Sequence, residues 1–368
     1  MSTGEDVAWV AELFTEATSS AARLTTLLRA THNSPQLPAA VELFASTLAS
    51  RSAEDAAAGA EGASEVLADI DGANHVLLGH IERHGSELDS ESAAALADLT
   101  SALTRMARGA LERLARTIAG DVEPVLAQLP LVVPEVVVDQ GPLPMVSAAA
   151  EAYVATIEDY FDEVLEVVPD VWCERLVKSL ANACVMAVED GLFSPRAVEH
   201  VDALASALSP TWMWVVTAWR DVWSLRALYA QYLSRRRAAA LFDRLLLVLD
   251  CVSVGAFRAS RCLPVALEAA EAPLVDDSAL AAELKTRLYA AVGAWGEEFT
   301  FAHVVHVLKL MSWLPDPVRV RAQKAAFKAV VNGPPETYTR PPSRLAGLVS
   351  LGLSPARTTA NNAGGAAA

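Results

Sequence analysis

Apolar residues recur at spacings of three and four along most of the chain, which is the period of one face of an α-helix. The first such stripe spans about three heptads and consists of Val7, Val10, Phe14, Ala17, Ala21, Leu24 and Leu28. We expect Phe14, Leu24 and Leu28 to be buried against other helices. The sequence Asn33-Ser34-Pro35 is expected to end this first helix, because proline cannot continue it.

The same spacing predicts a series of further helices. A second helix carries Val41, Phe44 and Leu48, and the next ones are expected at about 53–84, from Asp89 or Ser90 through Leu114, at 145–167, at 171–190, from Pro195, from Pro210, and at 239–256, 258–271, 278–294, 299–313 and 317–331. Ser194-Pro195, Ser209-Pro210 and Asp316-Pro317 each combine a capping side chain with a proline suited to the first helical turn.

One internal segment breaks this pattern. Residues 129–144, LPLVVPEVVVDQGPLP, contain four prolines and one glycine, which forbid a continuous helix. We therefore predict an all-α fold in which a multi-helix bundle is followed by stacked helical hairpins, an α-solenoid-like array. The predicted parts are an acidic N-terminal bundle at 1–128, a proline-rich linker at 129–144, the hairpin array at 145–331, and a proline-rich segment with a disordered tail at 332–368.

Charge is distributed unequally along the chain. Residues 1–170 hold 28 acidic and 8 basic residues, a net of −20, whereas residues 171–368 hold 17 and 21, a net of +4; together they give the −16 of the whole chain. An acidic first half repels nucleic acid and anionic membranes, while the second half can meet an anionic surface locally. This division suits oriented docking between proteins.

The residues that could carry chemistry do not form a recognisable catalytic or metal site. The cysteines lie in two pairs, each 11 residues apart, too far along a helix to share one ion, and we expect buried thiols. His80 and His84, like His303 and His306, have metal-compatible spacing, but neither pair has an evident third ligand in the sequence. We therefore predict no metal, no cofactor and no catalytic residue.

The acidic run Glu158–Glu163 loosely matches the aspartate-rich magnesium motif of all-helical isoprenoid enzymes. It lacks the aligned carboxylates and the second acidic motif that such chemistry requires, so we interpret it as a solvated face. Phosphate-binding glycine loops and nucleophile motifs are also absent from the sequence.

Three groups of residues are candidates for binding a partner. Arg321, Lys324 and Lys328 share one face of a predicted helix, and Arg235, Arg236 and Arg237 form a compact basic cluster. The third group is a row of tryptophans, which could be an exposed hot spot or part of the core: Trp212, Trp219 and Trp223.

These observations favour a non-enzymatic scaffold or adaptor subunit that acts through protein–protein contacts. Its expected partners are other protein subunits, with an acidic segment as the partner of the basic C-terminal helix, and nucleic acid is disfavoured. One alternative is a helical-repeat RNA-binding protein that uses the basic half, and another is a helical enzyme with an unrecognised site. The sequence contains neither a membrane-spanning apolar run nor a basic leader, so we expect the cytoplasm, with the nucleus as the alternative.

Overall fold

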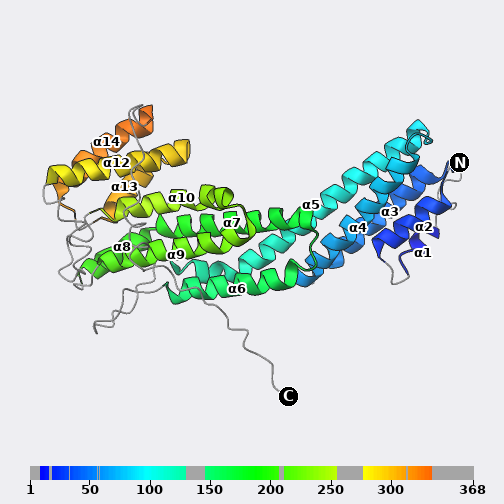
Figure 1. The fold of residues 1–368 in the computed structure, drawn as a ribbon, viewed down its shortest axis with the longest axis horizontal. Helices are drawn as coiled ribbons and strands as arrows, with labels where there is room; N and C mark the ends of the chain where they lie inside the picture. The colour runs from blue at the N-terminus through cyan, green and yellow to red at the C-terminus, as the bar shows by residue number, and fades with distance from the viewer. Residues whose placement is uncertain are drawn as a thin grey trace, which may run out of the picture. The chain divides into compact units, whose positions relative to one another are not determined.

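The structure is a computed structural model that describes residues 9–15, 19–32, 34–55, 57, 59–129, 146–206, 211–254, 277–311 and 314–333. Within these ranges every regular element is helical and no strand is found (Figure 1). The predicted all-α fold class is therefore confirmed. The helices form packed pairs, which do not by themselves establish a regular solenoid repeat.

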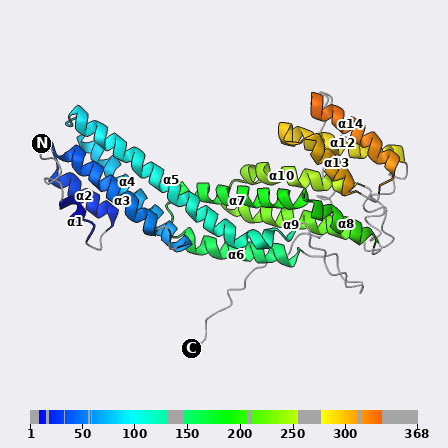
Figure 2. The same cartoon turned by 180° about the vertical axis from the view of Figure 1, so that it is seen from behind.

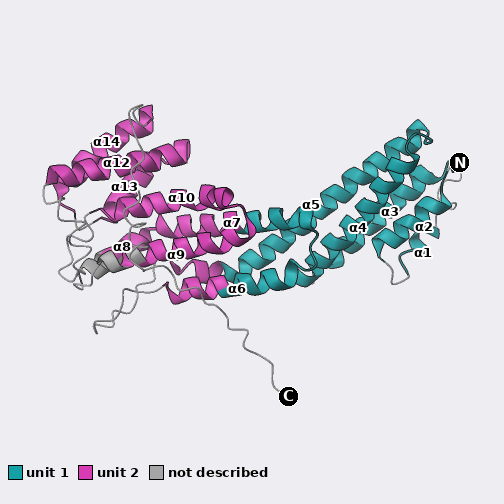
Figure 3. Cartoon of the chain, in the orientation of Figure 1, with its two compact units in different colours: residues 1–122, 155–180 teal, residues 123–154, 181–368 magenta. Residues whose placement is uncertain are grey.

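The chain divides into two compact units (Figure 3). Unit 1 comprises Met1–Val122 and Ala155–Leu180, and unit 2 comprises Glu123–Val154 and Ala181–Ala368. The predicted linker at 129–144 lies outside the described residues except for Leu129, and the predicted tail lies outside them from residue 334 onwards. The boundary expected in the linker and the disorder expected in the tail therefore stay predictions.

Unit 1 is built from the first helices of the chain. They are α1 (Trp9–Glu12), α2 (Ser20–Ala30), α3 (Leu37–Asp55), α4 (Ala60–His84) and part of α5 (Ser90–Leu126), followed by parts of α6 (Ala148–Val164) and α7 (Asp170–Leu192). Helix α2 packs against α4 and α3, and α1 packs against α3, as both views show (Figures 1 and 2).

The stripe expected to form one continuous first helix is divided between two helices. Helix α1 ends at Glu12, and α2 begins only at Ser20, where the side chain of Ser19 accepts a hydrogen bond from the backbone N–H of Ala22 at 3.3 Å. A serine that caps a new helix competes with continuation of the previous one. The predicted burial is nevertheless confirmed, with Phe14 2%, Leu24 0% and Leu28 3% exposed.

Two local signals decide where the long helices of unit 1 begin. Gly59 has φ +108°, a conformation that residues with a side chain rarely adopt, and it separates α3 from α4 within the stretch expected to be one helix. The carboxylate of Asp89 accepts the backbone N–H of Ser92 at 2.7 Å and so caps α5, as the sequence predicted.

Unit 2 contains the remaining helices. Besides the ends of α5, α6 and α7, they are α8 (Pro195–Ser206), α9 (Thr211–Tyr232), α10 (Arg235–Val252), α12 (Asp277–Trp295), the 3-10 helix η4 (Gly296–Glu298), α13 (Phe301–Lys309) and α14 (Asp316–Asn332). Helix α9 packs on α10, α10 on α12, and α14 on both α12 and α13. The helix predicted at 258–271 lies outside the described residues.

Polar groups are paired inside the core of unit 2. The hydroxyl groups of Tyr153 and Tyr229, both buried, lie 2.5 Å apart. The carboxylate of Asp221 on α9 accepts two hydrogen bonds from Ser147, just before α6, from its backbone N–H and from its hydroxyl, both at 2.8 Å. Such pairing offsets the cost of removing these groups from water.

Among the described residues, no helix is both long and apolar enough to cross a membrane.

Candidate functional site

The exposed face of α14 combines apolar and basic side chains. Val320, Phe327 and Val331 are 46%, 50% and 63% exposed. They follow spacings of seven and four, which place them on one side of the helix. Large apolar side chains gathered on one exposed face are typical of interaction surfaces.

The basic residues predicted on this helix flank the same apolar row. Arg321, Lys324 and Lys328 are all exposed, and Lys324 lies one turn from both Val320 and Phe327. We call these six residues the α14 surface: Val320, Arg321, Lys324, Phe327, Lys328 and Val331. The one acidic side chain of α14, Asp316, is paired with Arg319. The α14 surface therefore carries three positive charges and no negative charge of its own.

Packing within unit 2 holds the α14 surface in place. The opposite side of the helix is lined by small residues that are fully or almost fully buried, namely Val318, Ala322, Ala326 and Ala329. Phe327 makes an edge-to-face contact with Phe301 of α13, with ring centroids 5.1 Å apart. The alanines allow close approach to the neighbouring helices, so the bulkier apolar residues are left on the outer side.

The second predicted basic cluster occupies the first turn of α10. Arg235, Arg236 and Arg237 are exposed, and the hydroxyl of Ser234 caps the helix by accepting the N–H of Arg237 at 3.4 Å. Positive charge is unfavourable at this end of a helix, where the backbone dipole is already positive. In contrast to the α14 surface, this turn contributes no large apolar side chain that is exposed.

The predicted tryptophan row belongs mainly to the interior. Trp219 is 3% exposed and stacks on the half-buried Trp223 with ring centroids 5.5 Å apart. Arg226 lies over the outer ring, 4.9 Å from its centroid, and also pairs with Asp243 at 3.3 Å. The side chain of Trp212 lies outside the described part of the structure. The two described tryptophans thus offer little free apolar surface.

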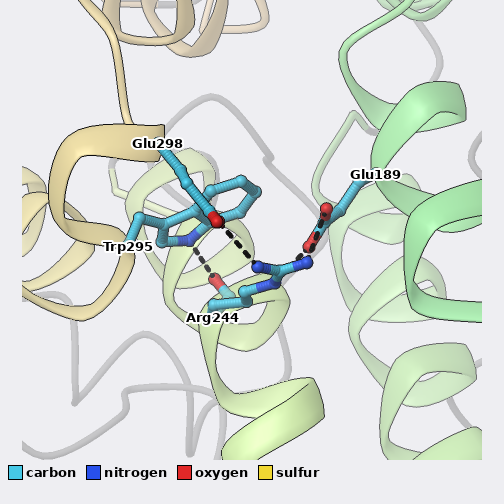
Figure 4. A network of polar contacts seen from close by, with 4 residues as sticks. All are labelled: Glu189, Arg244, Trp295 and Glu298. Atoms are coloured by element: carbon cyan, nitrogen blue, oxygen red, sulfur yellow. Dashed lines mark hydrogen bonds and ion pairs between the residues drawn. The ribbon is translucent and has the colours of Figure 1, made fainter. Parts of the chain in front are cut away.

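A network of polar contacts in unit 2 surrounds Arg244 of α10 (Figure 4). Its guanidinium pairs with Glu189 of α7 and donates to Glu298 of η4 at 3.0 Å. It also lies over the ring of Trp295, whose indole N–H donates to the backbone carbonyl of Arg244 at 3.2 Å. Burial raises the pKa of Glu189 to about 7, and the charge of Arg244 opposes that rise. These contacts join four elements, α7, α10, α12 and η4, and their role is structural.

The histidine pair of α13 is also occupied by structural contacts. The Nδ1 atom of His303 accepts the backbone N–H of Thr300 at 3.0 Å, which completes the cap of α13. The Nε2 atom of His306 lies 3.1 Å from the carbonyl oxygen of Leu192, to which it can donate. The ring of Phe193 contacts both imidazoles. His303 thus stabilises the start of α13, and His306 joins α13 to the end of α7.

In unit 1 the structure gathers histidines that are far apart in the sequence. A pocket of about 490 Å³ between α2 and α4 is lined by four of the seven histidines of the chain, His32, His75, His80 and His84. The rings of His32 and His84 have centroids 4.8 Å apart, and those of His80 and His84 are 5.0 Å apart. Burial lowers the pKa of His80, and the nearby charges of His84, His32 and Arg83 lower it further.

The fold brings together the ligands that the sequence pattern lacked. In the described residues, His32, His84 and Glu87 are a group whose ligand atoms all lie within 4.8 Å of one another. Helical spacing pointed to His80 and His84 but could not show that His32, at the end of another helix, lies beside them. The acidic run on α6 forms no such group among the described residues, and Asp159, Asp162 and Glu163 are exposed, as a solvated face requires.

Comparison with known proteins gave no match: no family model, no curated protein and no solved structure is similar to this chain.

Proposed function

We propose that the chain is a non-enzymatic scaffold or adaptor subunit whose α14 surface binds an acidic, amphipathic segment of another protein. The observation that carries this proposal is the coincidence, on one exposed helical face, of three large apolar side chains and three positive charges that form no ion pair with any described residue. Such a face resembles half of a helix–helix contact, in which an apolar row is flanked by charges that select the partner.

The apolar row supplies affinity in this proposal. Complete burial of a valine or phenylalanine side chain contributes about 1.5–3 kcal/mol. Because Val320, Phe327 and Val331 are each about half exposed, together they can add about 3 kcal/mol. Association also costs translational and side-chain freedom, so this row needs further contacts from the partner to give stable binding.

The charges determine the kind of partner. Arg321, Lys324 and Lys328 attract an acidic segment and set its orientation. For a nucleic acid, three phosphate contacts give a salt slope of only about −2 to −3, and the net charge of −16 opposes approach. Phosphate backbones also offer little to the apolar row. An acidic, amphipathic protein segment can contact both the apolar row and the basic side chains of the α14 surface.

The proposal extends to the arrangement of residues 145–331 as stacked helical hairpins. The packing of α9 on α10, of α10 on α12 and of α12 on α14 supports it for the described residues from 211 onwards. In such an array each helix pair presents an outer face, which is how helical-repeat scaffolds provide extended contact area.

Affinity purification of the full chain from its native extract, with quantitative mass spectrometry, tests the proposal. One variant reverses the charges of the α14 surface (Arg321→Glu, Lys324→Glu and Lys328→Glu), and a matched variant makes the same three reversals at residues 235–237. We expect specific partners to be lost only from the first variant, and the lost partner to contain an acidic amphipathic segment that binds the purified chain directly. Equal retention by both variants contradicts the proposal.

A further inference from the structure

The histidine pocket of unit 1 is formed by the ends of two helices. His32 follows Thr31, the C-cap residue of α2, and His84 is the last residue of α4. Glu87 lies in the turn that follows α4. Three side chains with metal-binding atoms are thus brought together from two segments more than 50 residues apart in sequence.

The geometry of these three side chains suits one small cation. The Nδ1 atom of His84 lies 3.4 Å from Oε2 of Glu87, and the ligand atoms of His32, His84 and Glu87 are all within 4.8 Å of one another. Tetrahedral zinc with Zn–N bonds of about 2.0–2.1 Å separates its ligand atoms by about 3.3 Å. His32 and Glu87 are exposed, so small rotations of their side chains can bring the ligand atoms from their present separation to the zinc-site separation without disturbing the core.

The backbone at this place also favours a cation. The carboxyl-terminal ends of α2 and α4 both lie at the pocket, and each helix end carries a partial negative charge. Two arginines, Arg29 and Arg83, oppose this effect from the pocket wall. The Nε atom of Arg83, however, donates to the carbonyl of Gly79 at 2.7 Å, which binds that side chain to its own helix.

We propose that His32, His84 and Glu87 bind one divalent cation of the zinc class, with solvent completing the coordination. Imidazole ligands select Zn²⁺, Co²⁺, Ni²⁺ or Cu²⁺, whereas Mg²⁺ and Ca²⁺ require oxygen ligands. Two imidazoles and one carboxylate with an open position form a zinc site of the open type. The nine-tenths-buried imidazole of His80 lies behind His84 and forms the inner wall of the pocket.

This site is independent of the function proposed for α14, because all its residues belong to unit 1 and those of the α14 surface to unit 2. Loss of cation binding therefore leaves partner binding by the α14 surface measurable, and the reverse also holds. Binding of an ion at this position joins the end of α2 to the turn after α4, and so cross-links two segments of the unit 1 bundle.

Metal titration of the untagged full-length protein, stripped with a chelator, tests the proposal. We expect isothermal titration calorimetry to show one Zn²⁺ per chain, and Co²⁺ to give the visible bands of a four-coordinate site. His32→Ala, His84→Ala and Glu87→Gln should each weaken Zn²⁺ binding, the histidine variants by more than about a hundredfold, since even outer-shell partners contribute about 10–100-fold. Circular dichroism verifies that each variant is folded.

A matched control removes the other histidine pair. The double variant His303→Ala, His306→Ala should bind Zn²⁺ as the wild type does, because both imidazoles are used by backbone contacts in unit 2. Zn²⁺ binding that survives His32→Ala and His84→Ala, or no Zn²⁺ binding at micromolar concentration, overturns the proposal. So does binding of inorganic phosphate in place of Zn²⁺, which would assign the pocket to anions through Arg29 and Arg83.

Discussion

Replacing Asp221 by asparagine should change how the stability of the protein depends on pH. This carboxyl group is 2% exposed, lies on α9 and accepts two hydrogen bonds from Ser147. Burial raises its pKa from 3.8 to about 7, although both hydrogen bonds oppose that rise. Asparagine has nearly the same shape and can still bond to Ser147, but it cannot ionise.

The size of the effect follows from the difference between the pKa of Asp221 in the folded state and its pKa in the unfolded state. The unfolded chain loses this proton near pH 4, whereas the folded chain keeps it until about pH 7. The folded state therefore holds the extra proton throughout that window, and stability falls as pH rises through it. A pKa difference of about three corresponds to about 4 kcal/mol.

Urea unfolding between pH 4 and pH 8, followed by tryptophan fluorescence, measures this effect. Trp214, Trp219 and Trp223 lie on the same helix as Asp221, so the signal reports the relevant part of the molecule. We expect the two proteins to be similar at pH 4 and the variant to gain about 4 kcal/mol over the wild type by pH 8.

Comparing the two proteins removes the contributions of all other titrating groups. A second variant, Ser147→Ala, removes a hydrogen bond that lowers the pKa of Asp221. The pH range over which the stability of this variant falls should therefore extend to higher pH. If the curves of the wild type and Asp221→Asn run parallel from pH 4 to pH 8, the carboxyl group is not held in its neutral form by burial, and the reasoning fails.

Two further substitutions test the packing of each unit. Phe14→Ala should cost about 3–5 kcal/mol, because Phe14 is 2% exposed and packs on Phe44 with ring centroids 5.4 Å apart; an unchanged thermal midpoint would contradict this. Tyr229→Phe should cost about 0.5–1.5 kcal/mol in chemical denaturation, since it removes the hydrogen bond between the hydroxyls of Tyr153 and Tyr229, 2.5 Å apart, and a stability equal to the wild type would show that this hydrogen bond contributes nothing net.

The helices themselves were largely predictable from apolar spacing and capping residues. Ser194-Pro195 starts α8 as expected, with the serine hydroxyl accepting the N–H of Ala197 at 3.3 Å. The break between α1 and α2 was missed because the apolar stripe continues through it. Periodicity records which side chains are apolar, whereas the break depends on the hydroxyl of Ser19, which competes for a backbone N–H.

The α14 surface was predictable in part. The sequence showed that Arg321, Lys324 and Lys328 share a face, but not that large apolar residues remain exposed beside them. This helix packs inward through alanines such as Ala322 and Ala326 and leaves Phe327 outside. A search for apolar residues alone predicts the opposite, because it assumes that the bulkiest side chains are buried.

The histidine pocket depended on a contact between distant segments. Helical spacing relates His80 to His84 but cannot place His32 or Glu87 next to them. One usable signal comes from helix direction. Successive helices of a bundle run in opposite directions, so the C-terminal ends of the first and third helices, α2 and α4, lie on the same side. Applied to the predicted helix ends, that rule would have paired His32 with His84.

The most direct test of the proposed function is site-specific cross-linking from the α14 surface. A photo-reactive amino acid replaces Lys324 in the full-length chain, and another replaces Val171, a 66% exposed residue of unit 1, as the control. After irradiation in native extract, mass spectrometry maps the cross-linked residues.

We expect cross-links from position 324, but not from position 171, to fall within an acidic amphipathic segment of one protein and to diminish at high salt, because the charges that orient the segment are screened. Cross-links to nucleic acid, to a second copy of this chain, or to many unrelated proteins at both positions would contradict the account.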